Sequence, residues 1–225
     1  MMVGKGLVAS LLMHLAEDPR LVIYASGVSN SLLDDDTEFH REKEMLLHVL
    51  HQKMKDQHLV YFSTFNVMDP SLQENKYVKH KLEIEALLKR RPDTIIVRIP
   101  ILIANSENNN TLINFLNKNI QEGISFDAFR NATRYFINAS DFQKILSADF
   151  LLQPRKNQTL HIAFPKALSV PELIMELETI AEKKGIYQLL DKGSAYTVED
   201  IDYPLSQVGD AKTYVAQSLK EIVCR

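Results

Sequence analysis

The chain of 225 residues is 45% hydrophobic, which is enough for one compact domain or for one domain with a small lobe. Its formal net charge is −3 with both signs interspersed, a balance that gives no support for nucleic-acid binding. Each apolar run is shorter than the roughly 20 residues of a membrane span, and we expect neither a membrane segment nor a signal peptide.

Cysteine and histidine usage favours a reducing compartment and no metal site. Cys224 is the one cysteine, so it has no partner for an intrachain disulfide, and we expect a cytoplasmic protein. The histidines of the first half are not joined by a carboxylate or a cysteine in a closing pattern, and we predict no bound metal.

The first residues predict a glycine-rich turn between a strand and a helix. A short strand at 1–3 precedes the pattern G-x-G-x-x-A at 4–9, and a helix follows over about 7–16. Gly4 would permit the tight turn, and Gly6 would let backbone N–H groups approach a pyrophosphate. The predicted cofactor contacts are Gly4, Lys5, Gly6 and Leu7. The alternative is an ordinary strand–helix turn.

A second apolar strand, at 21–27, follows almost at once. A complete dinucleotide fingerprint has an acidic residue about 20 positions after its glycines, at the end of the next strand, where it holds the adenosine ribose. Here the strand ends in Ser26 and Gly27 instead. We interpret these two residues as neighbours of the cofactor, and a plain strand-ending turn is the alternative.

The stretch 59–85 carries the candidate catalytic residues. An apolar, β-prone run predicts a buried strand that ends at Ser63 and Thr64. After an Asp-Pro-Ser turn, helical spacing puts Tyr77 and Lys81 one turn apart on one face of a helix. The alternative is an exposed helix turn on which the pair is incidental.

A hydroxyl, a phenol and an ammonium at these positions have a chemical use. A free phenol has a pKa near 10, and lowering it to about 7 requires roughly 4 kcal/mol. One cation at about 4 Å supplies about that much at an effective dielectric constant of about 20. We therefore predict that Tyr77 is an acid/base, that Lys81 lowers its pKa, and that Thr64 holds a substrate oxygen.

The rest of the chain alternates predicted strands and helices. An apolar strand over 95–103 breaks at Pro100. Later helices are expected at about 111–119, 141–151, 170–184 and from 210, with a strand at 158–164. The segment 123–135 is predicted to be irregular. Its Arg130 and Arg134 could clamp a phosphate, or they could be surface charge.

The order of these segments resembles the extended short-chain dehydrogenases/reductases. It looks most like the NAD-dependent epimerase/dehydratase branch, which acts largely on sugar nucleotides. The matching segments are Ser63-Thr64-Phe65-Asn66-Val67, Tyr77 with Lys81, IIVRIP at 95–100 and RYFINASDF at 134–142. The resemblance covers most of the chain and implies an α/β fold, a Rossmann-like parallel sheet flanked by helices, with NAD or NADP as the cofactor.

The resemblance also implies roles for individual residues. Thr64 stands at the catalytic Ser/Thr position, Tyr77 moves a proton while nicotinamide exchanges hydride, and Lys81 also binds the nicotinamide ribose. Further residues expected beside the cofactor are Ser63, Pro100 and Ile103. The substrate-binding candidates are Thr64, Asn66, Arg130 and Arg134.

Departures from the family limit what can be carried over. Family dehydratases have acidic residues just after the Thr, whereas Phe65 and Asn66 follow here, so we expect no dehydration. Ile101 replaces an Asn that meets the substrate near its diphosphate. The strand at 21–27 matches the family's fourth strand, so about two strands of the N-terminal half should be missing, and the sequence does not distinguish NAD from NADP.

These observations lead to two hypotheses of different class. The first is an NAD(P)-dependent epimerase or reductase acting on a sugar or nucleotide-sugar, and the second is a catalytically reduced family member that serves as a binding or scaffold subunit. The expected domains are a cofactor domain at 1–103 plus 134–164 and a small substrate-side lobe at 104–133 plus 165–225. Because family members often pair through the helix at about 38–55 and the helix of Tyr77, we expect a homodimer.

Overall fold

The computed structural model describes residues 1–31, 35–105, 111–154, 158–203 and 209–223, so that Cys224 lies outside it. The chain divides into two compact units. The first comprises 1–67, 72–99 and 140–162, and the second comprises 68–71, 100–139 and 163–225. Residues 100–103 and 134–139 group with the second unit because strand β5 (Ile101–Ile103) pairs there with β8 (Phe136–Asn138).

The first unit is built on a parallel sheet whose strands lie side by side in chain order. The strands are β1 (Met2–Val3), β2 (Leu21–Tyr24), β3 (His58–Thr64), β4 (Thr94–Ile99) and β9 (Thr159–His161). The three central strands are almost entirely buried, as expected for a parallel sheet with helices on both faces. The predicted α/β class is confirmed.

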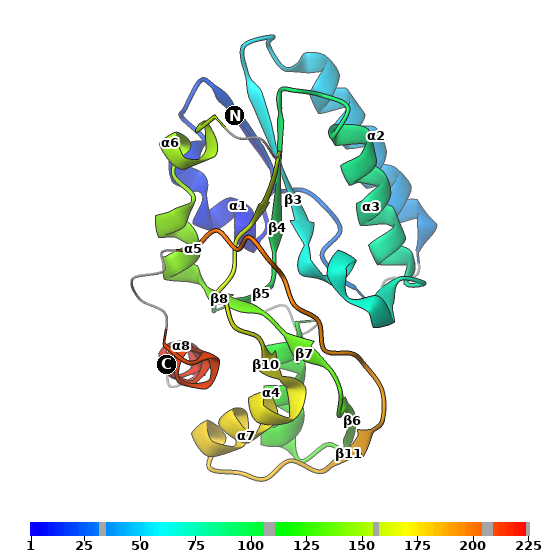
Figure 1. Ribbon diagram of the computed structural model, residues 1–225, viewed down its shortest axis with the longest axis vertical. Helices are drawn as coiled ribbons and strands as arrows, with labels where there is room; N and C mark the ends of the chain where they lie inside the picture. Colours follow the sequence, from blue (N-terminus) through cyan, green and yellow to red (C-terminus); the bar gives the residue numbers. More distant parts are fainter. Residues whose placement is uncertain (32–34, 106–110, 155–157, 204–208, 224–225) are drawn as a thin grey trace. The chain divides into compact units, whose positions relative to one another are not determined.

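Helices cover both faces of this sheet (Figure 1). One face carries α2 (Asp36–Gln52) and α3 (Lys76–Leu88), and the other carries α1 (Leu7–Leu11), α5 (Ala139–Ile145) and α6 (Ala148–Leu151). Short 3₁₀ helices lie at Met13–Leu15, Phe65–Met68 and Pro70–Leu72. Side chains alternate along β3, so Tyr61 meets α2 and α3 whereas Phe62 contacts Phe142 of α5.

Strand β1 is an edge of the sheet in the described part of the chain. In a common doubly wound order, 3-2-1-4-5-6, two strands lie beyond the first one. The observed order β1-β2-β3-β4-β9 matches the part of that sheet from the first strand onward, and no described residue forms a strand beyond β1. This agrees with the predicted shortening of the N-terminal half.

In its described residues, the second unit combines three strand pairs with three α-helices. β5 is parallel to β8, β6 (Phe126–Phe129) is parallel to β11 (Tyr187–Leu190), and β7 (Thr133–Arg134) is antiparallel to β10 (Leu168–Ser169). The helices α4 (Leu112–Glu122), α7 (Val170–Ala181) and α8 (Ala211–Val223) pack on one apolar core. The prediction that 123–135 is irregular is wrong, because β6 and β7 lie in it. None of the described helices is long and apolar enough to cross a membrane.

The first turn requires a glycine at one of its two glycine positions. Gly4 has a φ of +125°, and a Cβ built on it would stand 2.3 Å from the carbonyl oxygen of Ala25. Gly6 has a φ of −77°, and a Cβ built there would meet nothing within 4 Å. Gly4 therefore serves the fold, whereas Gly6 leaves open space.

We expect Gly4→Ala to lower the free energy of unfolding by about 2 kcal/mol or more, because of both the strained φ and the clash with Ala25. Gly6→Ala should change it by less than about 0.5 kcal/mol. Urea unfolding of the two variants beside the unaltered protein measures the difference. Equal losses for the two variants would contradict the assigned clash.

Candidate active site

The structure brings two of the predicted catalytic residues close together. Thr64 is the last residue of β3, and Tyr77 lies in the first turn of α3. That turn is fixed by Asn75, whose side chain accepts a hydrogen bond from the N–H of Val78. The hydroxyl of Thr64 lies near the phenol of Tyr77 and lowers its pKa. Thr64 also accepts a hydrogen bond from the backbone N–H of Asn66 at 3.2 Å.

Tyr77 is buried, with 5% of its surface exposed. Burial raises the pKa of its phenol above the ordinary value; the nearby hydroxyl of Thr64 opposes the rise and the charge of Glu42 adds to it. The prediction that Lys81 lowers this pKa is therefore wrong. At neutral pH Tyr77 holds its proton.

The reason lies in the partner of Lys81. Its buried ammonium donates hydrogen bonds to Oε1 of Glu42 and to the hydroxyl of Tyr61, each at 2.9 Å, and it lies 5.7 Å from the centre of the Tyr77 ring. A single positive charge at that distance would stabilise a phenolate by about 3 kcal/mol at an effective dielectric constant of about 20. The carboxylate beside the ammonium carries the opposite charge and cancels most of that field.

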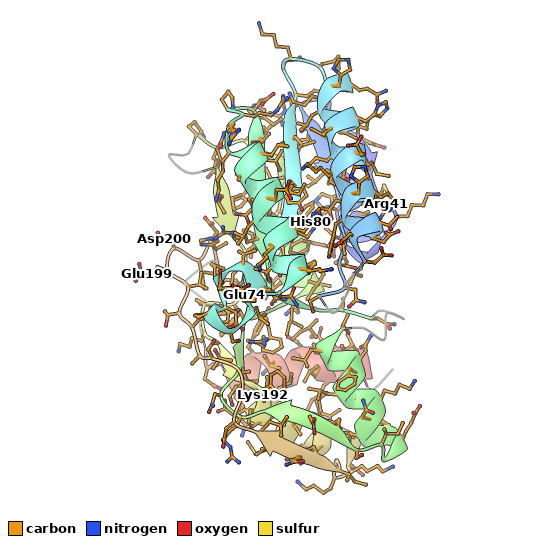
Figure 2. The ribbon with its side chains drawn as sticks, turned by 90° about the vertical axis from the view of Figure 1, so that its right-hand side faces the viewer. Arg41, Glu74, His80, Lys192, Glu199 and Asp200 are labelled. Atoms are coloured by element: carbon orange, nitrogen blue, oxygen red, sulfur yellow. The ribbon has the colours of Figure 1, made fainter. Side chains whose placement is uncertain are left out.

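Glu42 is the centre of this network. Its carboxylate is fully buried and accepts hydrogen bonds from the N–H of Val28 at 2.7 Å, the hydroxyl of Tyr61 at 2.7 Å and Lys81 at 2.9 Å. Nε2 of His80 lies 3.0 Å from its second oxygen, and Figure 2 shows His80 on the side of α3 toward α2. Burial raises the pKa of Glu42, but the hydrogen bond with His80 and the charge of Lys81 outweigh it and lower the pKa to about 2.

The predicted cofactor residues Ser26 and Gly27 connect the first turn to this network. A Cβ built at Gly4 would stand 3.0 Å from the backbone nitrogen of Ser26. A Cβ built at Gly27 would stand 2.7 Å from Nζ of Lys81 and 2.8 Å from Oε1 of Glu42. The backbone after β2 therefore lies directly against the ion pair, and a glycine lets it do so.

Ser63 is turned toward a different partner. Its hydroxyl donates a hydrogen bond to Oε1 of Glu85 at 2.7 Å, and it is buried. Arg98, which is the register partner of Ser63 on β4, binds both oxygens of that carboxylate, at 2.9 Å and 2.5 Å. The structure thus places Ser63 in a buried ion-pair cluster of its own.

Four further predicted residues belong to the second unit, namely Pro100, Ile103, Arg130 and Arg134. Arg134 donates to the buried carboxylate of Asp69 at 2.9 Å, and the exposed Arg130 pairs with Asp191 at 2.9 Å. Each guanidinium therefore serves its own ion pair, rather than forming one clamp with the other.

Sequence reasoning missed Glu42, Tyr61 and His80. A signal for Glu42 was present, since it lies on the buried stripe of α2 with Phe39 and Leu46. A carboxylate on an apolar stripe must find a buried partner. Among the described residues, no group of three or more His, Cys, Asp or Glu side chains could hold a metal ion.

Neither a protein-family model nor a curated protein matches the sequence. Solved structures do match the chain over most of its length. RMD from Pseudomonas aeruginosa, solved with NADPH, matches with a TM-score of 0.64 and 17% identity, covering 96% of this chain and 84% of that one. UDP-glucose 4-epimerase from Thermus thermophilus, solved with NAD, matches with a TM-score of 0.64 and 12% identity, covering 94% and 80%.

A third similar structure is UDP-N-acetylglucosamine 4-epimerase from Methanobrevibacter ruminantium in complex with UDP-N-acetylmuramic acid. The TM-score is 0.65 at 15% identity, over 95% of this chain and 78% of that one. At these identities the likeness establishes the fold. The expected resemblance to the epimerase/dehydratase branch is confirmed at that level.

The lowered pKa of Glu42 predicts a loss of stability in acid. Its folded pKa of about 2 lies below its ordinary value of 4.5. The carboxylate therefore stabilises the folded state at pH values above about 4.5, and this contribution is lost as the pH falls through about 2. The difference corresponds to about 3 kcal/mol.

We expect Glu42→Gln to lower the free energy of unfolding at neutral pH and to flatten its fall between pH about 5 and about 2. Denaturant unfolding at several pH values measures this slope. Glu44→Gln is the matched control, because Glu44 is exposed on the same helix. A Glu42→Gln slope equal to that of the control would show that the buried carboxylate does not carry the effect.

Proposed function

We propose that the chain is an NAD(P)-dependent epimerase or reductase that acts on a sugar or nucleotide-sugar. The observation that carries this proposal is the placement of the Thr64 hydroxyl, at the carboxyl end of β3, beside the buried phenol of Tyr77. Ligands of parallel α/β sheets bind outside the carboxyl ends of the strands. The structural neighbours, which include enzymes solved with NADPH or NAD, support the same kind of activity.

The residues of the first turn fit a nicotinamide dinucleotide. The open space at Gly6 leaves room for a pyrophosphate, which Gly4, Lys5, Gly6 and Leu7 would hold through their backbone. Ser26 and Gly27 would border the cofactor next to that turn. When bound, the nicotinamide supplies or accepts a hydride. In the described part of the chain no strand beyond β1 offers a residue to the adenosine ribose, so we expect that end to be held weakly, whether the cofactor is NAD or NADP.

The chain's own residues would handle the proton and the substrate oxygen. Thr64 has its oxygen engaged by the N–H of Asn66, so its proton is directed toward an acceptor. Tyr77 lies beside that hydroxyl and would exchange its proton with the substrate. Asn66 is partly exposed beside Thr64, where it would contact the substrate. Lys81 supports the ring of Tyr77 from the buried side.

A second candidate function is a binding or scaffold subunit that has lost turnover. The engagement of Lys81 by Glu42 favours this candidate, because the ammonium is not free to bind a nicotinamide ribose. In that case the placement of Tyr77 beside Thr64 would serve stability alone.

Titration of the protein with NADH or NADPH, followed by nucleotide fluorescence, tests the first proposal. We expect a dissociation constant below about 1 mM, and we expect Tyr77→Phe to keep this affinity while losing at least about 100-fold in turnover of a keto-sugar nucleotide. Tyr187→Phe, on β11 of the second unit, is the control. If neither dinucleotide binds at millimolar concentration, the enzymatic proposal fails. A scaffold would instead keep its partner affinity in Tyr77→Phe.

A further inference from the structure

Among the described residues, the polar network around Lys81 is closed. Lys81 donates to Glu42 and Tyr61, and Tyr61 donates in turn to the same oxygen of Glu42. The second oxygen of Glu42 receives the N–H of Val28 and faces His80. The positive charge of Lys81 is therefore matched by a negative charge that is held from four directions and shielded from water.

We propose that Glu42 is a positioning residue that holds the ammonium of Lys81 against Tyr61, so that at neutral pH Tyr77 can give a proton to a substrate carbonyl but cannot take one from a substrate alcohol. The inference rests on the proposed function and narrows it to the reduction of a carbonyl substrate. Glu42 acts on Tyr77 through its own charge and by opposing the charge of Lys81.

The groups that face this part of the site come from every packed element. They are Tyr24 from β2, Glu42 from α2, Tyr61 and Thr64 from β3, and His80, Lys81 and Glu85 from α3. Tyr24 donates to the backbone oxygen of Glu42 and helps to fix that residue. Glu85 is itself paired with Arg98. Since Glu42 balances Lys81, the charge of Lys81 is not left unopposed beside Tyr77, and burial keeps the phenol protonated.

The reaction balances as a two-electron reduction. The carbonyl carbon gains the hydride that a reduced nicotinamide dinucleotide supplies, and the π electrons of the C=O bond move to the oxygen. That oxygen takes the phenolic proton of Tyr77, which gives an alcohol, an oxidised nicotinamide and a phenolate. The phenolate regains a proton from water before the next turnover.

The charge assignment can be tested without any substrate, by titrating phenolate absorbance. The difference between the unaltered protein and Tyr77→Phe isolates one phenol, which we expect not to ionise below pH about 10. In Glu42→Gln the ammonium loses its counter-charge. The difference in absorbance between this variant and Glu42→Gln/Tyr77→Phe should show that the acid dissociation constant of Tyr77 is raised by roughly 100-fold, which means that its pKa is lowered. Glu42→Asp should restore the original behaviour, and Glu44→Gln should leave it unchanged.

The pH dependence of the two reaction directions is an independent measurement. If Tyr77 is protonated throughout, reduction should be flat between pH about 6 and about 9 while oxidation rises tenfold per pH unit. In Glu42→Gln, the pH at which reduction begins to fall and oxidation levels off should move down by about two pH units.

Two results overturn the proposal: a Tyr77 phenol that ionises near neutral pH in the unaltered protein, or an unchanged phenol in folded Glu42→Gln. If Glu42→Gln does not fold, the comparison of the unaltered protein with Tyr77→Phe still tests the proposal. If the protein binds no dinucleotide and turns nothing over, the proposed function fails, while the absorbance titration still reports on the role of Glu42.

Discussion

The burial of one carboxylate against one ammonium is the constraint on which the first unit depends. Removing Glu42 and Lys81 from water costs several kcal/mol for each ion, and only good geometry and further hydrogen bonds can offset that cost. The network supplies them from Val28, Tyr61 and His80. It thereby fixes α2 and α3 against the ends of β2 and β3. Packing and the electrostatics of the candidate site are consequences of the same contact.

This contact also explains which features could be predicted from the sequence. The parallel sheet, the turn at Gly4, the break at Pro100 and the shared helix face of Tyr77 and Lys81 all follow from local periodicity and backbone chemistry. The pKa of Tyr77 does not, because it depends on Glu42, which is distant in sequence and approaches from another helix. The roles of the predicted site residues remain predictions.

The strands of 123–135 could not be predicted for a related reason. Each is short, and each pairs with a partner far along the chain, β6 with β11 and β7 with β10. A local pattern does not reveal such pairing. Likewise, Arg134 carries no local sign that it will be bound by Asp69, which comes from the turn before α3. Non-local charge pairs decide which of the candidate cations are free.

The division into units has a consequence for how the chain tolerates change. The backbone passes from one unit to the other at five peptide bonds: 67/68, 71/72, 99/100, 139/140 and 162/163. Neither unit is thus a continuous piece that could be cut out and folded alone. The shortened region between β1 and β2, however, lies within the uninterrupted segment 1–67. Two strands can be absent there without disturbing any of the five passages, so such a deletion leaves the interleaved connectivity intact.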